Sequence, residues 1–369
     1  MRMKRRLLAS AAAVLLAFGA AACGSDDEGG SGSSGSSNSS DSKLKGKIAV
    51  LLPDSKSSDR WELADRRFFK EAFDAAGLSK DDYIISNAEG DPATQRSQAE
   101  QAITEGAKVI LLVNLDPGSG AAIIDAAKAQ GVTMIDYDRL TTDGNADYYV
   151  SGNAVEAGRL QAQGLLEDLE GKSGARVAIL NGAPTDSFAT DLDKGNKEVL
   201  DQNPDAVKVI AKQAVPNWDG QKALQIFEQM LQAHDNKVDG ILAANDTLAN
   251  AAISALQARK LDMVPTSGLD ATAQALQHIL AGEQSFTVYF SIKDQATKAA
   301  KLALEIARGQ KPSGITDEVD NGKKKVPTIL LKPITIRKDN IGDTVIADDF
   351  ASWDDVCTGK YEQYCPEDR

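Results

Sequence analysis

Short apolar runs rich in β-branched residues alternate with longer segments of helical periodicity from Lys45 onward. These runs lack a strict alternation of apolar and polar positions, which is typical of parallel strands covered on both faces. The expected strands are Lys47–Leu52, Tyr83–Asn87, Val109–Asn114, Val132–Asp138, Tyr148–Asn153, Arg176–Asn181, Val207–Gln213, Gly240–Asn245, Thr266–Asp270 and Phe286–Phe290.

Helical segments separate most of these strands, and the order βαβαβα occurs twice along the chain. We therefore expect an α/β protein with two doubly wound lobes, each built on a parallel sheet. The length of 369 residues agrees with this, because it exceeds what one hydrophobic core usually serves. The expected helices lie near 61–77, 92–106, 117–130, 156–170, 187–201, 220–234, 247–260, 271–282 and 293–309.

Residues 1–22 have the pattern of a secretory signal peptide. Met1–Arg6 is basic, and the apolar run that follows is shorter than the roughly 20 residues of a membrane-spanning helix. Cys23 follows three alanines, as in a bacterial lipobox whose cysteine is lipidated; the alternative is an ordinary cleavage site beside a chance cysteine. Residues 24–42 are mostly Gly and Ser, so we expect 23–44 to be a flexible linker anchored through Cys23.

Charge and rare residues exclude several classes of protein. The chain has 41 Lys and Arg against 54 Asp and Glu, a formal net charge of −13, so it has no broad basic surface for nucleic acid. Its two histidines exclude a site with three histidine ligands, and its three cysteines exclude a four-cysteine zinc or iron–sulfur site. We expect neither a cofactor nor a metal ion.

Polar side chains gather where the expected strands end, and ligands of doubly wound sheets bind beyond the carboxyl ends of the strands. Capping of the following helix is the alternative role, and we expect it to account in part for Asp246 and Asp270. Capping does not account for Arg139, a long cation beside Asp138. The residues at these strand ends are Asn114, Asp138, Arg139, Asn181, Asn245, Asp246 and Asp270.

The expected folded part contains no pattern for a nucleophilic or metal-dependent hydrolase, neither G-x-S-x-G nor H-E-x-x-H. A carboxylate pair for glycoside cleavage stays open, because any two acidic residues can meet in space. Carboxylates, amides and guanidinium groups bind hydroxyls, and aromatic rings pack on the C–H face of a sugar. Trp61 and Trp218 lie in loops that would face the cleft, although core packing is an equal alternative for either one.

The chain resembles the type I periplasmic-binding-protein-like sugar receptors of ABC importers, in the ribose, galactose and xylose group and closest to D-xylose-binding proteins. The resemblance covers residues 47–350. The stretches that carry it are Asp59–Trp61, Tyr137–Arg139, Asn181–Asp186, Gln213–Trp218, Ala244–Asp246, Gly268–Ala271, Thr287–Tyr289 and Val326–Phe350.

This resemblance implies a set of sugar contacts, and the sequence departs from the family pattern at two of its positions. After Asp186 the family has two Asn, where this chain has Ser187 and Phe188; after Tyr289 it has a Lys, where this chain has Phe290. Either the ligand is different, and a less polar, deoxygenated or bulkier sugar would suit two phenyl rings, or the cleft has repacked with more stacking around xylose or a related pentose or hexose. The implied ligand-binding residues are Arg60, Trp61, Asp138, Arg139, Asp186, Phe188, Trp218, Asn245, Asp270 and Phe290.

The resemblance also implies two lobes joined by three crossings, near Tyr149–Ser151, Phe286–Tyr289 and Val326–Leu331. The N-terminal lobe would comprise 45–150 plus 290–326, and the C-terminal lobe 151–289 plus 327–350. Residues 351–369 form a polar tail, in which an exported protein would pair Cys357 with Cys365, two free thiols being the alternative.

The leading interpretation is a lipid-anchored, extracytoplasmic solute receptor that closes on a monosaccharide and delivers it to an ABC permease. The permease and its ATPase would be separate chains, and the receptor a monomer without enzyme activity. Two alternatives remain open at this stage. One is a receptor of the same fold that signals to a membrane sensor, and the other is an extracellular glycoside-acting enzyme that uses Asp138, Asp186 or Asp270.

Overall fold

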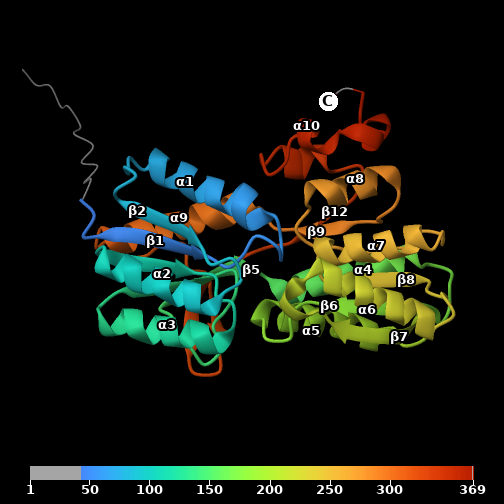
Figure 1. Cartoon of the computed structure of the whole chain (residues 1–369), viewed down its shortest axis with the longest axis horizontal. Coiled ribbons are helices and arrows are strands. Elements are labelled where there is room, and N and C mark those ends of the chain that lie inside the picture. The colour runs from blue at the N-terminus through green and yellow to red at the C-terminus, as the bar shows by residue number, and fades with distance from the viewer. Residues whose placement is uncertain (1–42, 368) are drawn as a thin grey trace, which may run out of the picture. The chain divides into compact units, whose positions relative to one another are not determined.

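The computed structural model describes residues 43–367 and 369, which belong to one compact unit. The predicted signal peptide, Cys23 and the linker as far as residue 42 lie outside these residues. Figure 1 shows two α/β lobes, one around β1–β5 and the other around β6–β8. Among the described residues, no helix combines the length and the apolar character that crossing a membrane requires.

The first lobe is built on a seven-stranded sheet with the order β10-β11-β5-β4-β3-β1-β2. Every neighbouring pair is parallel except β10 with β11. The central strands are buried along nearly their whole length, as expected for a sheet covered on both faces. The strands are β1 Lys47–Leu52, β2 Tyr83–Asn87, β3 Ala107–Leu112, β4 Thr133–Tyr137, β5 Tyr148–Gly152, β10 Asp317–Asp320 and β11 Lys325–Leu331.

Helices cover both faces of this first sheet (Figure 1). On one face α1 and α9 pack over a cluster that includes Val50, Phe69 and Ala300. On the other face α2 and α3 pack over Ile110 and Leu112. The elements are the π-helical turn η1 Trp61–Asp65, α1 Arg66–Ala75, α2 Pro92–Thr104, α3 Pro117–Ala129 and α9 Ile292–Ala307.

The second lobe contains the parallel strands β7-β6-β8, extended by two isolated bridges. Ile241 bridges to Thr266 and Leu269 bridges to Val288, so the segment 266–270 links β8 to the antiparallel pair β9 and β12. The elements are α4 Ala154–Asp168, β6 Ala175–Asn181, α5 Ser187–Gln202, β7 Val207–Ala214, the short η2 Pro216–Trp218, α6 Gly220–Ala233, β8 Gly240–Ala243, α7 Asp246–Ala258, α8 Ala273–Ala281, β9 Thr287–Tyr289 and β12 Ile334–Ile336.

The α/β fold with two doubly wound lobes is confirmed, and three local predictions are corrected. Segment 266–270 makes single bridges rather than a regular strand. The expected helix 61–77 begins as a π-helical turn, because the N–H of Arg66 bonds to the carbonyl of Trp61. The first lobe's sheet extends past the predicted boundaries at 150 and 326, because β5 runs to Gly152 and β11 pairs with it up to Leu331.

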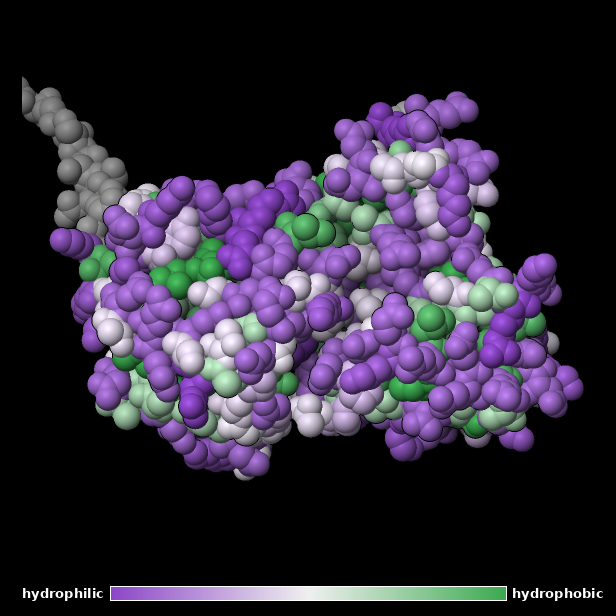
Figure 2. Space-filling model, in the orientation of Figure 1, coloured by the Kyte–Doolittle hydropathy of each residue, from purple (hydrophilic) through white to green (hydrophobic). Residues whose placement is uncertain are grey.

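The surface carries no continuous apolar area in the view of Figure 2, which is mainly hydrophilic with separate hydrophobic patches. Large hydrophobic side chains that are exposed in the described part of the chain are spread over both lobes and the C-terminal segment. They are Leu63, Val209, Ile315, Ile334 and Tyr364. Scattered residues of this kind are normal for a soluble surface and indicate no binding site by themselves.

The C-terminal segment packs on α8 and is closed by a disulfide between Cys357 and Cys365. The segment contains η3 Gly342–Ile346, α10 Trp353–Val356 and η4 Gly359–Tyr364. The side-chain amide of Gln277 donates to the Val356 carbonyl at 3.0 Å, and the Tyr361 hydroxyl donates to Glu283 at 3.2 Å. The disulfide therefore closes a short loop that lies against one helix.

Replacing both Cys357 and Cys365 with serine should loosen this segment and leave ligand binding unchanged. The cross-link of so short a loop contributes roughly 2–3 kcal/mol by its effect on the unfolded chain. Limited proteolysis should then cut the double variant after residue 350 faster than the unmodified protein. Equal cleavage rates, or a weaker affinity for ligand, would contradict this local role.

Candidate functional site

Arg60 organises the first lobe's side of the site. Its guanidinium donates to both oxygens of Asp65, from Nε at 2.9 Å and from Nη2 at 3.0 Å, and to Asp138 Oδ2 from Nη1 at 3.0 Å. The π-helical turn brings Asp65 back toward Arg60, since residues five apart are one turn apart in this geometry. Burial raises the pKa of Asp65, and the guanidinium opposes this effect. The Tyr137 hydroxyl adds a bond to Asp65 at 2.6 Å.

Asp138 lies at the end of β4 with a left-handed backbone, φ 67°. Its carbonyl accepts from the Tyr149 hydroxyl at 2.9 Å and from the Ser151 hydroxyl at 2.7 Å, so β5 holds this conformation. The side-chain amide of Gln295, on α9, donates to Oδ2 at 3.2 Å. A strained backbone held by its neighbours is typical of functional positions, because it fixes where the side chain points.

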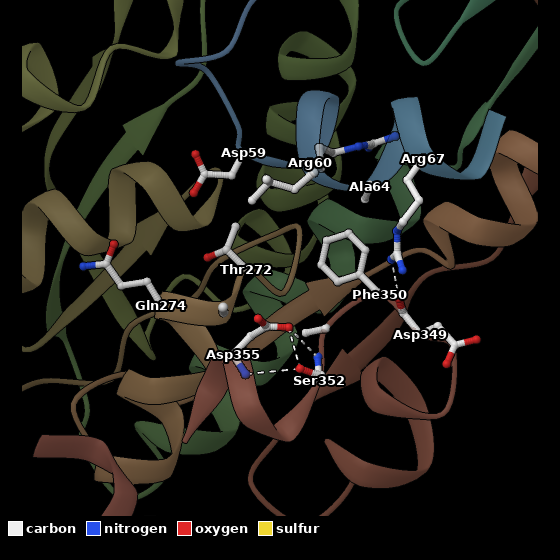
Figure 3. Close-up of a pocket in the computed structure, with 13 residues that line it drawn as sticks. Asp59, Arg60, Ala64, Arg67, Thr272, Gln274, Asp349, Phe350, Ser352 and Asp355 are labelled. Atoms are coloured by element: carbon white, nitrogen blue, oxygen red, sulfur yellow. Dashed lines mark hydrogen bonds between the residues drawn. The ribbon is translucent and has the colours of Figure 1, made fainter. Parts of the chain in front are cut away.

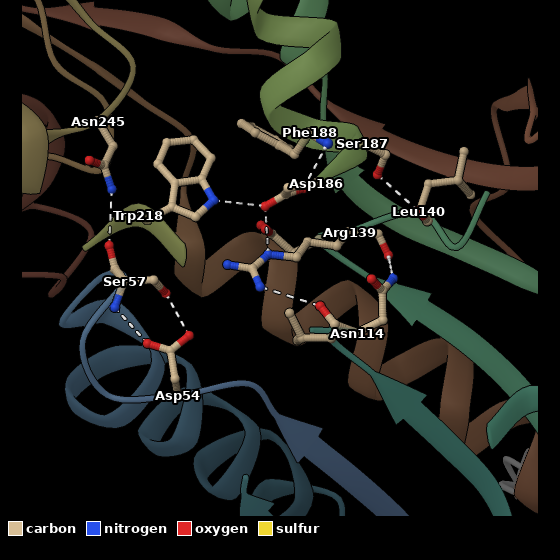
Figure 4. Close-up of polar contacts among 12 residues, drawn as sticks. Asp54, Ser57, Asn114, Arg139, Leu140, Asp186, Ser187, Phe188, Trp218 and Asn245 are labelled. Carbon is tan, nitrogen blue, oxygen red and sulfur yellow. Dashed lines mark hydrogen bonds and ion pairs between the residues drawn. The ribbon is translucent and has the colours of Figure 1, made fainter. Parts of the chain in front are cut away.

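On the second lobe's side, Asp186 and Trp218 hold each other. The indole Nε1 of Trp218 donates to Asp186 Oδ2 at 2.9 Å, while Asp186 Oδ1 caps α5 through the N–H of Phe188 at 2.9 Å (Figure 4). Trp218 itself has φ 54° and follows Asn217 at φ 58°. Gly182 makes room for the ring, because a Cβ there would come within 2.2 Å of it.

Side-chain contacts join the two lobes across the cleft, among them a hydrogen bond from the Thr247 hydroxyl to the Ser57 carbonyl at 3.3 Å. Arg139 Nε pairs with Asp186 Oδ2 at 2.9 Å, and the Ser187 hydroxyl donates to the Leu140 carbonyl at 2.9 Å (Figure 4). The Ser58 hydroxyl donates to Asp270 Oδ2 at 2.7 Å, and the Asn245 amide donates to the Ser57 carbonyl at 3.1 Å. These bonds close the lobes on each other.

The capping expected of two acidic residues at strand ends is wrong. Asp246 accepts from the Thr287 hydroxyl at 2.7 Å and from the N–H of Thr272 at 2.8 Å, so it ties α7 to β9. Thr272, and not Asp270, is the N-cap of α8. Asp270 has φ 103° and points its carboxylate toward Ser58 instead. Burial raises the pKa of Asp270 to about 7.

A narrow cavity of about 30 Å³ lies between the lobes. Its charged lining residues Arg60, Asp138, Arg139, Asp186 and Asp270 are only 4–7 % exposed. A ligand therefore reaches them only if the lobes separate. The lining residues are Ser57, Ser58, Arg60, Trp61, Asp138, Arg139, Asp186, Phe188, Trp218, Asn245, Leu269 and Asp270.

Nine of the ten predicted ligand-binding residues line this cavity, and Phe290 does not. The ring of Phe290 is 2 % exposed and packs edge-on against Phe188, with 6.1 Å between centroids. It also lies against Gly152, where a Cβ would approach the ring to 2.5 Å. Phe290 thus supports Phe188 from behind, and the direct ligand contact expected for it is absent from this closed arrangement.

Two aromatic rings face the polar groups in this cavity. Trp61 donates from Nε1 to the Ser57 hydroxyl at 3.1 Å, and the Arg60 guanidinium lies 4.4 Å from its ring centroid. The Arg139 guanidinium lies 5.7 Å from the same ring. Trp218, from the second lobe, lines the same cavity. Both rings are held by hydrogen bonds, so each can stack on a ligand without further ordering.

Several supporting residues gave no sequence signal. Ser57 and Ser58 form cross-lobe contacts, and Asp54 holds Ser57 through bonds to its N–H at 2.5 Å and its hydroxyl at 2.8 Å. Asp65 and Gln295 orient Arg60 and Asp138 from helices. Short polar residues and a helical glutamine occur on any surface, so only the fold identifies these roles.

A larger groove of about 500 Å³ lies beside this cavity. It runs between Arg67, the start of α8 and the segment Asp349–Asp355 (Figure 3). Arg67 is bound there to the Asp349 carbonyl, and Ser352 and Asp355 cap one another. Arg60 is the only predicted ligand-binding residue in its lining. The smaller cavity contains nine of the predicted ligand-binding residues, so it is the candidate site.

The arrangement suits a small polyhydroxylated molecule. The carboxylates accept from hydroxyls, the Arg139 guanidinium donates, and the indole rings cover apolar faces. Asp186 already accepts two hydrogen bonds, from Trp218 and from the N–H of Phe188, and forms an ion pair with Arg139, so it orients the site more than it offers a free acceptor. Within the described residues, no cluster of His, Cys, Asp and Glu is arranged to hold a metal ion.

Comparisons with known proteins agree on one family. A model described as the periplasmic binding protein domain matches residues 48–311. The chain is 34 % identical to the D-xylose-binding periplasmic protein of Escherichia coli (strain K12) and 35 % identical to that of Haemophilus influenzae, each over 82 % of this chain and 90 % of the relative.

A solved protein structure resembles this chain in both fold and sequence. The carbohydrate transporter solute binding protein from Chloroflexus aurantiacus, in complex with D-glucose, has a TM-score of 0.76 at 28 % identity. The match covers 84 % of this chain and 97 % of that one. The family match and these relatives agree with the two-lobed α/β architecture and the interlobe cavity of this chain. The chain therefore belongs to the periplasmic binding protein family and has the type I fold of that family.

Proposed function

We propose that this protein is the extracytoplasmic substrate-binding component of an ABC sugar importer. It binds a monosaccharide between its lobes and presents the closed form to a membrane permease, whose ATPase is a further chain. The observation that carries the proposal is the convergence of Arg60, Asp138, Arg139, Asp270 and Trp218 on one buried cavity. Relatives that are named for binding xylose and a solved relative that holds D-glucose support the ligand class.

We further propose that the receptor is a monomer that does not transform its ligand and that is anchored through a lipid on Cys23. Two of the three acidic residues that an enzyme would use have structural bonds: Asp186 caps a helix, and Asp138 accepts hydrogen bonds from Arg60 and Gln295. Support for the anchor comes from the sequence alone, in the three alanines before Cys23 and the Gly- and Ser-rich segment after it.

Titration calorimetry of the chain from Lys43 against D-xylose, D-ribose, D-glucose and D-galactose tests the proposal. We expect saturable binding of at least one sugar at micromolar concentration or below, with a smaller radius of gyration by X-ray scattering when that sugar is bound, because ligand stabilises the closed form. The sugar should be recovered chemically unchanged. The proposed function would be overturned if none of these four sugars bound and if the amino sugars tested in the next subsection also failed to bind.

A further inference from the structure

The cations of the site are already paired by acidic residues of the protein. Arg60 donates two bonds to Asp65 and one to Asp138. Arg139 pairs with Asp186 at 2.9 Å. Each guanidinium is 4–7 % exposed, so bulk water screens these pairs little. Neither cation is left for another buried carboxylate.

Asp270 is a buried carboxylate of the site that is not paired with either guanidinium group. It is 6 % exposed, lines the cavity, and receives a side-chain hydrogen bond from the Ser58 hydroxyl at 2.7 Å. It takes part in no ion pair with any residue that the structure describes. Burial raises its pKa to about 7. The positive charge of Arg60 is the strongest opposing effect, the hydrogen bond from Ser58 also lowers the pKa, and the carboxylates of Asp246 and Asp138 raise it further.

The cluster as a whole is therefore short of positive charge. With the buried carboxylates next to it, the cluster contains two guanidinium groups and five carboxylates, those of Asp65, Asp138, Asp186, Asp246 and Asp270, which gives a formal charge of −3 when all are ionised. An unpaired buried charge is costly, so either Asp270 is protonated or a ligand supplies the missing cation. The same balance disfavours anionic sugars such as uronates and sugar phosphates.

Two carboxylates of the cavity lining each have an oxygen that receives no hydrogen bond from a described side chain. Asp138 and Asp270 each receive hydrogen bonds from described side chains on Oδ2, which leaves Oδ1 of both for the ligand. An ammonium group has three donors and suits such a pair of oxygens better than a hydroxyl, which has one. The Trp61 and Trp218 rings in the same lining can cover the rest of the ligand and attract the cation.

Resting on the proposed function, we infer that the ligand is an amino sugar or an aminated cyclic polyol whose protonated amine pairs with Asp270. Because the ammonium pairs with an ionised carboxylate in a dry cavity, it should raise affinity about tenfold or more over the parent hydroxyl compound. Asp270→Asn keeps the shape of the residue and removes the charge, so it should bring this ratio close to one.

Calorimetry at pH 7 with three matched pairs tests this inference: D-glucosamine, D-galactosamine and D-mannosamine, each against D-glucose, D-galactose or D-mannose. At least one amino sugar should bind about tenfold or more tightly than its parent. Asp59→Asn is the matched control, because Asp59 is an exposed acid next to Arg60 in the sequence that does not line the cavity; it should leave the ratio unchanged.

The outcomes separate this inference from the proposed function. Neutral sugars that bind as tightly as their amino forms would overturn the inference and leave the sugar receptor in place. An amino-sugar preference that survives in a folded Asp270→Asn variant, as judged by circular dichroism, would overturn the assignment to Asp270. If neither the amino nor the neutral sugars bind, both proposals are wrong.

Discussion

Replacing Arg60 with alanine should lower the free energy of unfolding by about 3–5 kcal/mol and abolish ligand binding. The substitution removes the cation from two buried carboxylates, Asp65 with no exposed surface and Asp138 at 6 %. Burial already raises the pKa of Asp65 although the guanidinium lowers it. Without the guanidinium, the unpaired carboxylate of Asp65 must become protonated or hydrated. Urea unfolding followed by tryptophan fluorescence gives the stability, and calorimetry with the sugar found in the screen gives the affinity.

Arg96→Ala is the matched control for this change. Arg96 pairs with Glu100 at 3.6 Å on the surface of α2, where the two side chains are 65 % and 63 % exposed. Exposed pairs of this kind contribute about 0–1 kcal/mol, so this variant should unfold and bind almost like the unmodified protein. An Arg60→Ala variant with an unchanged urea midpoint would show that the buried cluster does not depend on its cation.

The fold and most of the cavity follow from patterns that the chain repeats. Apolar runs without alternation predicted parallel strands, and β1 and β2 have the predicted bounds. Strand ends in a doubly wound sheet lie at one edge, and the two lobes turn these edges toward one cavity. Asp138 of the first lobe and Asn245 of the second therefore line the same cavity although they are far apart in the sequence. The two aromatic positions needed the resemblance, because a loop tryptophan alone is as often a core residue.

The remaining features depend on geometry that no local pattern encodes. A π-helical turn differs from an α-helix in one hydrogen bond, and that bond decides whether Asp65 meets Arg60. Phe290 follows a strand like other lining residues, yet its ring turns toward Gly152 and away from the cavity. Asp246 and Asp270 stand at positions typical of caps, but Thr287 and Ser58 from distant segments engage them instead.

Replacing Gly182 with alanine should weaken ligand binding about thirtyfold or more, which corresponds to about 2 kcal/mol, the usual scale for a central tryptophan. The new Cβ would lie 2.2 Å from the Trp218 ring atoms Cη2 and Cζ2, so the ring must move. The backbone of Trp218 is already fixed at φ 54°, so it cannot follow the ring, and a displaced ring loses the hydrogen bond from Trp218 Nε1 to Asp186 at 2.9 Å. Calorimetry measures the affinity, and thermal unfolding measures the accompanying overpacking cost of about 1–3 kcal/mol.

Gly342→Ala is the control, because its Cβ would meet its nearest neighbour, Trp353 Cζ2, at an ordinary 3.5 Å, and binding should not change. The mechanism is tested by combining Gly182→Ala with Trp218→Ala. Both substitutions act through one indole ring, so the double variant should bind no more weakly than Trp218→Ala alone. If the two losses instead add in full, Gly182 affects the ligand by a route other than Trp218, and the glycine does not act by making room for the indole.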